Sequence, residues 1–197
     1  MLTVGLDEVG RGCWAGPLVA GAVVLPANFT LADTSIILRD SKKLSSAQRE
    51  KASIWIKANA LAFGLGWVDP AEIDALGLSQ GVQLAFTRAF AEVKLQLPYD
   101  EVIIDGNINY FPEDPKARAV VRADDIFPCV SAASIIAKVS RDNYMAEIAS
   151  KYSGYGFEKH VGYGTAAHIA ALKELGVSDI HRRSYKPVRA LLRSRAS

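Results

Sequence analysis

The amino-acid sequence predicts an α/β fold with a mixed central sheet flanked by helices and a helical C-terminal part. Two strand-like runs, MLTVGL and LVAGAVVLP, follow each other at hairpin-length spacing near the N-terminus. Later strand-like runs alternate with helical patterns, an order that is typical of α/β domains. At 197 residues, the chain is expected to form a single domain over residues 1–197.

The first part of the chain contains two of the predicted strands. Residues 1–6 form a short apolar run that ends at an acidic pair, and residues 18–25 form a second apolar run. Pro26 stops the second run because proline cannot donate a hydrogen bond to a sheet. Residues 30–44 combine polar and apolar residues without a period, so a loop region is expected there.

Helices dominate the pattern over the next fifty residues. Ser45 or Ser46 is a suitable cap for a helix that runs to about residue 60, because a serine hydroxyl can accept from the first free amides. LAFGLGWV is the third predicted strand, and Asp69-Pro70 opens a short helical turn. Residues 78–97 have apolar side chains three and four positions apart, as in an amphipathic helix that ends before a proline.

The second half of the chain contains two further strands and two further helices. EVIID is the fourth strand and residues 117–122 are the fifth. The alanines and isoleucines of residues 128–152 predict one long helix with an apolar face. Another helix begins at Thr165, and Gly176 stops it.

Acidic residues stand at the ends of three predicted strands. Asp7 and Glu8 follow the first strand, Asp105 ends the fourth, and Asp124 follows the fifth. Residues just beyond strand ends meet in the crevice where ligands bind in open sheets. Carboxylates brought together repel unless they are protonated or bridged by a cation, and oxygen ligands suit Mg²⁺ or Mn²⁺. The pattern predicts a shared metal site, with separate turn aspartates as the alternative.

The net charge of +2 is too small to indicate a nucleic-acid partner by itself. Basic residues nevertheless crowd the C-terminus without an acid among them: Arg182, Arg183, Lys186, Arg189, Arg193 and Arg195. Such a cluster can bind a polyanion or form a solvated helix end.

The cysteine pattern and the hydropathy indicate the cellular compartment of the protein. Cys13 and Cys129 form no spaced disulfide framework, which favours a reducing environment. The N-terminus lacks the pattern of a signal peptide, and no apolar run approaches the roughly 18 residues of a membrane span. A soluble cytoplasmic protein without membrane contact is expected.

Six blocks occur in a specific order along the chain. They are DEVGRG with AGPLVAGAVVLP, DSKKLS, IIDGN, VSAASIIAKVSRDNYM, YGFEKHVGYGT and HRRSYKPV. In this order they closely resemble the bacterial-type ribonuclease HII family, also called type 2 ribonuclease H. The resemblance implies a ribonuclease H-like fold and hydrolysis of the RNA strand of RNA–DNA hybrids. It also implies cleavage 5′ of single ribonucleotides embedded in duplex DNA, leaving 3′-hydroxyl and 5′-phosphate ends.

The resemblance further implies catalysis with two divalent cations, Mg²⁺ or Mn²⁺, held by four carboxylates. These map onto Asp7, Glu8, Asp105 and Asp124. The family's Lys-Gly-Asp-Ser passage reads RADD here, so Asp125 is a neighbouring candidate for the fourth position. This mechanism needs no histidine, and His160, His168 and His181 are expected to be hydrogen-bonding or surface residues.

Substrate-binding residues are also implied by the resemblance. The resemblance implies that the loop Gly10-Arg11-Gly12 senses the 2′-hydroxyl at an RNA–DNA junction and that Tyr163 stacks on the adjoining sugar. Further substrate contacts are expected from Lys42, Lys43, Ser131, Ser134, Lys138, Arg182 and Arg183.

The implied partners are RNA–DNA hybrids and ribonucleotide-containing DNA duplexes, bound by a monomer. A ribonuclease HIII-like enzyme and a non-catalytic hybrid-binding module are the alternatives. The intact Gly-Arg-Gly loop with Tyr163 counts against the first, and the presence of all four carboxylates counts against the second.

Overall fold

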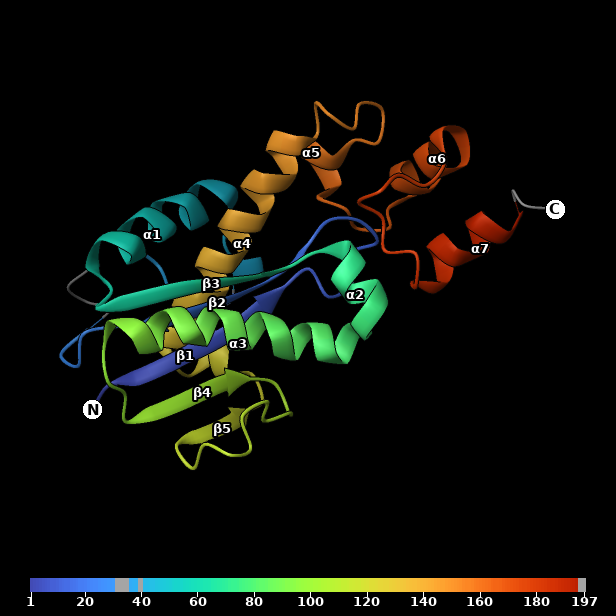
Figure 1. Ribbon diagram of the computed structural model, residues 1–197. Coiled ribbons are helices and arrows are strands. Elements are labelled where there is room, and N and C mark those ends of the chain that lie inside the picture. The colour runs from blue at the N-terminus through green and yellow to red at the C-terminus, as the bar shows by residue number, and fades with distance from the viewer. Residues whose placement is uncertain (31–35, 39–40, 195–197) are drawn as a thin grey trace. The chain divides into compact units, whose positions relative to one another are not determined.

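The computed structural model describes residues 1–30, 36–38 and 41–194 (Figure 1). Asp40 of the DSKKLS block, Arg195 of the basic C-terminus and part of the predicted loop over 30–44 lie outside the described residues. The chain divides into two compact units. Unit 1 comprises Met1–Val9, Val19–Trp67 and Gln83–Val139, and unit 2 comprises Gly10–Leu18, Val68–Val82 and Ser140–Ser197.

A five-stranded sheet in the order β3-β2-β1-β4-β5 forms the centre of unit 1. Strand β1 (Thr3–Val9) pairs antiparallel with β2 (Leu18–Val24) and parallel with β4 (Glu101–Asp105). Strand β4 pairs parallel with β5 (Ala117–Val120), and β3 (Ala62–Val68) lies at the other edge. The mixed sheet predicted from the sequence is therefore confirmed.

Helices cover both faces of this sheet. Figure 1 shows α3 (Leu78–Gln96) across one face and α4 (Pro128–Ile148) across the other. Helix α1 (Ser46–Asn59) shares a buried apolar cluster with α4, through Ile56 of α1 and Ile135 of α4. Residues 83–96 of α3 and 128–139 of α4 belong to unit 1, and the other residues of these two helices belong to unit 2.

The cap of α1 resolves the choice between two serines. The Ser45 hydroxyl accepts from the Gln48 amide at 3.2 Å, and the Gln48 side chain accepts from the Ser45 amide at 2.9 Å. This reciprocal pair satisfies two amides that the helix itself leaves without partners. Ser45 is therefore the cap, and Ser46 is the first helical residue.

Unit 2 consists mainly of short helices around its own core. They are α2 (Pro70–Leu76), α5 (Phe157–His160), α6 (Ala166–Leu175) and α7 (Lys186–Ser194). Met145, Phe157 and Leu172 are buried in the core of this unit. The predicted start of a helix at Thr165 is confirmed, since its hydroxyl accepts from the His168 amide.

Three boundaries differ from the sequence prediction. The first strand, predicted to end before the acidic pair, continues through Asp7 and Glu8 to Val9. The helix predicted to reach residue 152 ends at Ile148 and gives way to turns. The fifth strand stops at Val120, because Arg122 takes a left-handed conformation with φ of 58° and begins a 3-10 turn over Ala123–Asp125. The four-residue helix α5 was not predicted, as one turn is too short to show a helical period. Among the described residues, no helix combines the length and the apolar character needed to cross a bilayer.

Candidate active site

Two of the predicted carboxylates lie side by side on parallel strands of unit 1. The register pairs Leu6 of β1 with Ile104 of β4, so Asp7 and Asp105 occupy the next corresponding positions. Gly5 is two residues before Asp7 and on the same face, and a Cβ at Gly5 would lie 2.3 Å from the backbone of Cys129 in α4. The Asp7 side chain therefore faces α4.

The environment of Asp7 disfavours a lone negative charge. Asp7 is only 8% exposed, and its burial raises the pKa of the carboxyl well above the ordinary value. The negative charges of Glu8 and Asp105 raise this pKa further, whereas hydrogen bonds from Ser134 and from the Glu8 amide lower it. Three of the four predicted carboxylates thus interact electrostatically, and a cation among them would relieve their repulsion.

A turn after β5 connects the fourth predicted carboxylate to this group. The Ala123 amide donates to Asp105 Oδ1 at 2.7 Å, which ties the 3-10 turn to the end of β4. The Ser131 hydroxyl donates to the backbone carbonyl of Asp124 in the same turn. Sequence reasoning placed Ser131 near the cleft as a substrate contact, and in the structure its hydroxyl supports the turn.

Asp125, the neighbouring candidate, is held by two cations. Lys43 Nζ lies 2.6 Å from one of its carboxylate oxygens and Arg122 Nη2 lies 2.9 Å from the other. The hydrogen bond from Lys43, followed by that from Arg122, lowers the pKa of the Asp125 carboxyl. Both carboxylate oxygens of Asp125 are therefore already engaged by side chains of the chain itself.

The remaining predicted contacts of unit 1 are Ser134, Lys138 and Lys42, and Ser134 forms a hydrogen bond with a carboxylate of the site. Ser134 bonds Asp7 and also lies 3.0 Å from the Ser41 hydroxyl. Lys138 is one helical turn after Ser134 on α4 and is partly exposed, and Lys42 is exposed beside Ser41.

The donor set fits a hard divalent cation. The carboxylates offer only oxygen atoms, which Mg²⁺ and Mn²⁺ prefer. Across residues 1–30, 36–38 and 41–194, no group of three or more His, Cys, Asp or Glu side chains is already arranged as a metal cage. An ion that binds through one or two carboxylates and completes its coordination with water and substrate phosphate suits such a site.

The predicted Gly-Arg-Gly loop lies in unit 2, where its two glycines have different surroundings. Gly10 has φ of 90°, and a Cβ there would lie 2.5 Å from Arg141 Nε. Gly12 is exposed and outside the left-handed region, and a Cβ there would meet only Tyr163 Cε1, at 4.0 Å. The fold requires glycine at position 10 but not at position 12.

Arg182 holds this loop from within unit 2. Its guanidinium is fully buried and donates to the carbonyls of Gly10 at 2.7 Å, Arg11 at 3.2 Å and Gly16 at 2.9 Å. The Tyr185 hydroxyl donates to the Arg11 carbonyl as well. Because the carbonyl and the following amide of a trans peptide point in opposite directions, the Gly12 N–H points away from Arg182 and Tyr185.

The buried position of Arg182 changes the expectation that it contacts substrate. A guanidinium whose donors are directed at buried carbonyls supports the loop rather than a ligand in solvent. Arg141, which sequence reasoning did not single out, is equally buried and donates to the carbonyls of Pro17, Ala15 and Val161. The position of Arg141 within the apolar pattern of α4 is the sequence signal that could have indicated its burial. Arg183 is exposed, and its amide donates to Asp74 at 2.8 Å.

Tyr163 lies next to the loop within unit 2. Its backbone forms an isolated antiparallel bridge with Cys13, and the Trp14 amide donates to the Gly162 carbonyl at 2.8 Å. The Tyr163 residue is 37% exposed, and burial of the hydroxyl, together with Cys13, raises its pKa to about 12. The structure thus brings together the predicted loop and the predicted tyrosine.

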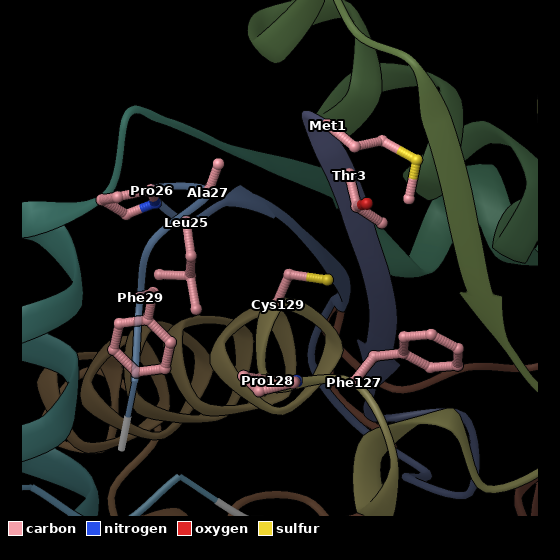
Figure 2. Close-up of a pocket in the computed structure, with 9 residues that line it drawn as sticks. All are labelled: Met1, Thr3, Leu25, Pro26, Ala27, Phe29, Phe127, Pro128 and Cys129. Carbon is pink, nitrogen blue, oxygen red and sulfur yellow. The ribbon is translucent and has the colours of Figure 1, made fainter. Parts of the chain in front are cut away.

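A separate pocket of about 190 Å³ lies at the opposite end of β1 from the carboxylates (Figure 2). Figure 2 shows Met1 and Thr3 at the start of β1 beside Cys129 at the start of α4. Burial raises the pKa of the Cys129 thiol to about 11, so the thiol is protonated at neutral pH. None of the predicted site residues lines this pocket.

Comparisons with known proteins show the family and the fold of the chain. The family model described as Ribonuclease HII matches residues 4–188. A ribonuclease HII of Halorhodospira halophila is 48% identical over 96% of this chain and 94% of that protein. The crystal structure of ribonuclease H2 from Pyrococcus horikoshii matches with a TM-score of 0.83 and 27% identity, over 100% of both chains. The ribonuclease HII of Archaeoglobus fulgidus, solved in a complex with PCNA, matches with a TM-score of 0.78 and 26% identity, over 94% of this chain and 96% of that chain.

Proposed function

Because the chain belongs to the ribonuclease HII family, we propose that four carboxylates of unit 1 carry out its hydrolysis of RNA in RNA–DNA hybrids. They are Asp7, Glu8, Asp105 and Asp124. Members of this family are type 2 ribonucleases H, endoribonucleases that depend on divalent metal ions. The observation that carries the proposal is the parallel register of β1 and β4, which sets Asp7 beside Asp105 just beyond the last paired residues, Leu6 and Ile104.

The side chains of Asp7 and Asp105 each have a contact that orients them for binding a cation. Ser134 and the Glu8 amide direct hydrogen bonds at Asp7, and the Ala123 amide fixes one oxygen of Asp105. Mg²⁺ or Mn²⁺ ions, two in the active complex, supply Lewis acidity for attack on the phosphodiester when they are bound. We infer that these hydrogen bonds hold the carboxylates in place before the substrate arrives.

We assign the fourth position to Asp124 rather than Asp125. Lys43 and Arg122 already engage both oxygens of Asp125, and replacing either cation by a metal ion would break an existing ion pair. Asp125 then serves to hold the turn that carries Asp124. In this assignment Lys43 acts on the turn, while the exposed Lys42 contacts substrate phosphate. We propose further polyanion contacts for Lys138 and Arg183.

We propose that unit 2 supplies the group that distinguishes RNA from DNA. The loop Gly10-Arg11-Gly12 has its carbonyls turned toward Arg182 and Tyr185, so the Gly12 amide is directed elsewhere. Its missing side chain lets a sugar approach that amide closely. Tyr163 offers a partly exposed ring beside it. These features support recognition of a 2′-hydroxyl and cleavage 5′ of a single embedded ribonucleotide.

The test is cleavage of a DNA duplex that contains one ribonucleotide, with Mg²⁺, with Mn²⁺ and with neither. We expect metal-dependent cleavage that leaves a 3′-hydroxyl and a 5′-phosphate. Cleavage of long hybrids alone would support the ribonuclease HIII-like alternative, and binding without cleavage would support a hybrid-binding module.

Two matched variants test the choice between the neighbouring aspartates. Asp124→Asn is expected to abolish cleavage, whereas Asp125→Asn should retain most of it because its ion pairs lie on the surface. The reverse order of activities would move the assignment to Asp125.

We also propose that the two units work as one catalytic domain in a monomer located in the cytoplasm. Both cysteines are free thiols, as a reducing compartment favours. Light scattering of the purified protein, with and without a hybrid duplex, measures the oligomeric state.

A further inference from the structure

Three histidines from different segments of unit 2 lie together in its interior. His160, His168 and His181 are 8%, 0% and 1% exposed. The rings of His160 and His168 stack with centroids 4.6 Å apart, and those of His168 and His181 lie 5.2 Å apart. We call these three residues the histidine network. The cleavage reaction proposed above uses none of them.

The hydrogen bonds of His181 and His168 determine which nitrogen of each ring carries a proton. The Ser178 amide donates to His181 Nδ1 at 3.0 Å, so the proton of neutral His181 is on Nε2. His181 Nε2 lies 3.0 Å from His168 Nε2 and donates to it. The proton of neutral His168 is therefore on Nδ1, which donates to the Tyr163 carbonyl at 2.9 Å.

His160 completes the network on the other side of the same turn. The Gly162 amide lies 3.3 Å from His160 Nδ1, so the proton of this ring is on Nε2 and is donated to the Tyr155 carbonyl at 2.8 Å. The Tyr163 amide donates to the His160 carbonyl at 2.9 Å. Both backbone groups of Tyr163 are thus bonded to histidines of the network.

We propose that His168, oriented by His181, is a positioning residue for Tyr163. The proposal rests on the function proposed above for Tyr163 at the RNA–DNA junction. His168 fixes the carbonyl of Tyr163, and this sets the direction in which the partly exposed ring leaves the backbone. The Thr165 amide donates to the same carbonyl at 2.8 Å, so loss of His168 loosens the turn without unfolding it.

The direction of these bonds requires neutral rings. A second proton on His168 would place two N–H groups face to face between His168 and His181. Burial lowers the pKa of both side chains, in keeping with this arrangement. The network therefore holds one hydrogen-bond pattern at neutral pH, as a positioning device requires.

Two substitutions at position 168 distinguish the roles of the two ring nitrogens of His168, Nδ1 and Nε2. An asparagine amide reaches the place of Nδ1 and can still donate to the Tyr163 carbonyl, whereas a glutamine amide reaches the place of Nε2 and cannot. The measured quantity is the ratio of kcat/KM on a single-ribonucleotide duplex to kcat/KM on a long hybrid. We expect His168→Gln to lower this ratio by about fivefold, the effect of one hydrogen bond, and His168→Asn to keep it within about twofold.

A double-mutant cycle with Tyr163→Ala shows whether the effect passes through Tyr163. We expect the effect of His168→Gln on the ratio to disappear when Tyr163 is already alanine. Additive effects, or equal ratios for the Asn and Gln variants, would overturn the positioning role. If Tyr163→Ala alone leaves the ratio unchanged, the proposed junction function of Tyr163 fails instead.

A second pair of variants, at position 181, gives a test that does not depend on correct folding of the variants at position 168. Thermal melting checks the folding of each variant. His181→Gln retains a donor at the place of Nε2, and His181→Asn does not. We expect only the Asn variant to lower the ratio. A lowered ratio in both variants, or in neither, contradicts an orientation of His168 by His181.

Discussion

Replacing Gly12 by alanine should reduce cleavage without destabilising the fold. The new Cβ would meet only Tyr163 Cε1, at 4.0 Å, and the backbone of Gly12 is not left-handed. An unstrained alanine restricts the unfolded chain and typically stabilises by about 0.4–1 kcal/mol. The methyl group would block close approach to the Gly12 amide. Loss of a hydrogen bond there lowers kcat/KM by up to about tenfold on ribonucleotide-containing duplexes.

Gly10→Ala is the matched control, because the same methyl group has no space at position 10. Its Cβ would lie 2.5 Å from Arg141 Nε and 3.0 Å from the Pro17 carbonyl, in a backbone with φ of 90°. Left-handed strain and the displaced guanidinium together should cost at least about 2 kcal/mol. For a chain of this size, that corresponds to a fall in Tm of about 4–8 °C.

The assay combines thermal unfolding followed by circular dichroism with kcat/KM on a single-ribonucleotide duplex in Mg²⁺. The expected result is a Gly12→Ala protein with an unchanged or higher Tm and impaired cleavage, beside a Gly10→Ala protein with a lower Tm. Wild-type cleavage by Gly12→Ala would refute a substrate contact at this amide. An equal loss of Tm in both variants would show that glycine at position 12 serves the fold.

Three further outcomes are expected. Asp105→Asn should abolish cleavage while the protein stays folded, since it removes a charge from the proposed metal site, and activity near wild type in Mg²⁺ would exclude an essential role. Lys42→Ala should weaken binding to all duplexes alike and reduce the slope of log affinity against log salt by about 1; a loss confined to one base sequence would contradict a phosphate contact. Burial lowers the pKa of His181 to about 4, below the ordinary value of about 6.5. The unfolded chain therefore takes up a proton first as the pH falls, and the free energy of unfolding should drop by about 2 kcal/mol between pH 7 and pH 5. Urea titrations of the wild type and of His181→Asn at both pH values measure this, and an identical drop in the variant would exclude His181 as its source.

Two of the strands were predictable because their apolar runs stand directly before acidic residues. The apolar runs before Asp7 and Asp105 identified these strands, and the structure shows that they are parallel neighbours and that the first continues to Val9. The catalytic role of the acids stays a prediction. The ion pairs that engage Asp125 could not be predicted from the sequence pattern. One of them comes from Lys43, which is 82 positions away in the chain.

The buried arginines show where sequence reasoning failed. Arg182 stands in a run of basic residues, whose charge pattern indicates a solvated surface. In the structure, backbone carbonyls of the Gly10–Gly16 segment surround it. A sequence does not show where backbone carbonyls will lie in the fold. The charge pattern alone therefore cannot distinguish an arginine that binds backbone carbonyls from an arginine that is exposed to solvent.

The position of Arg182 near the C-terminus also affects the order in which the protein matures during synthesis. Its partners Gly16 and Gly10 precede it by 166 and 172 positions. Contacts between such distant segments close the largest loops of the chain and form late. A nascent polypeptide can assemble β1, β4 and the turn with Asp124 well before Arg182 has been translated. The loop proposed to recognise the 2′-hydroxyl is then shaped last, and a product truncated before Arg182 keeps its acids but lacks the residue that holds this loop.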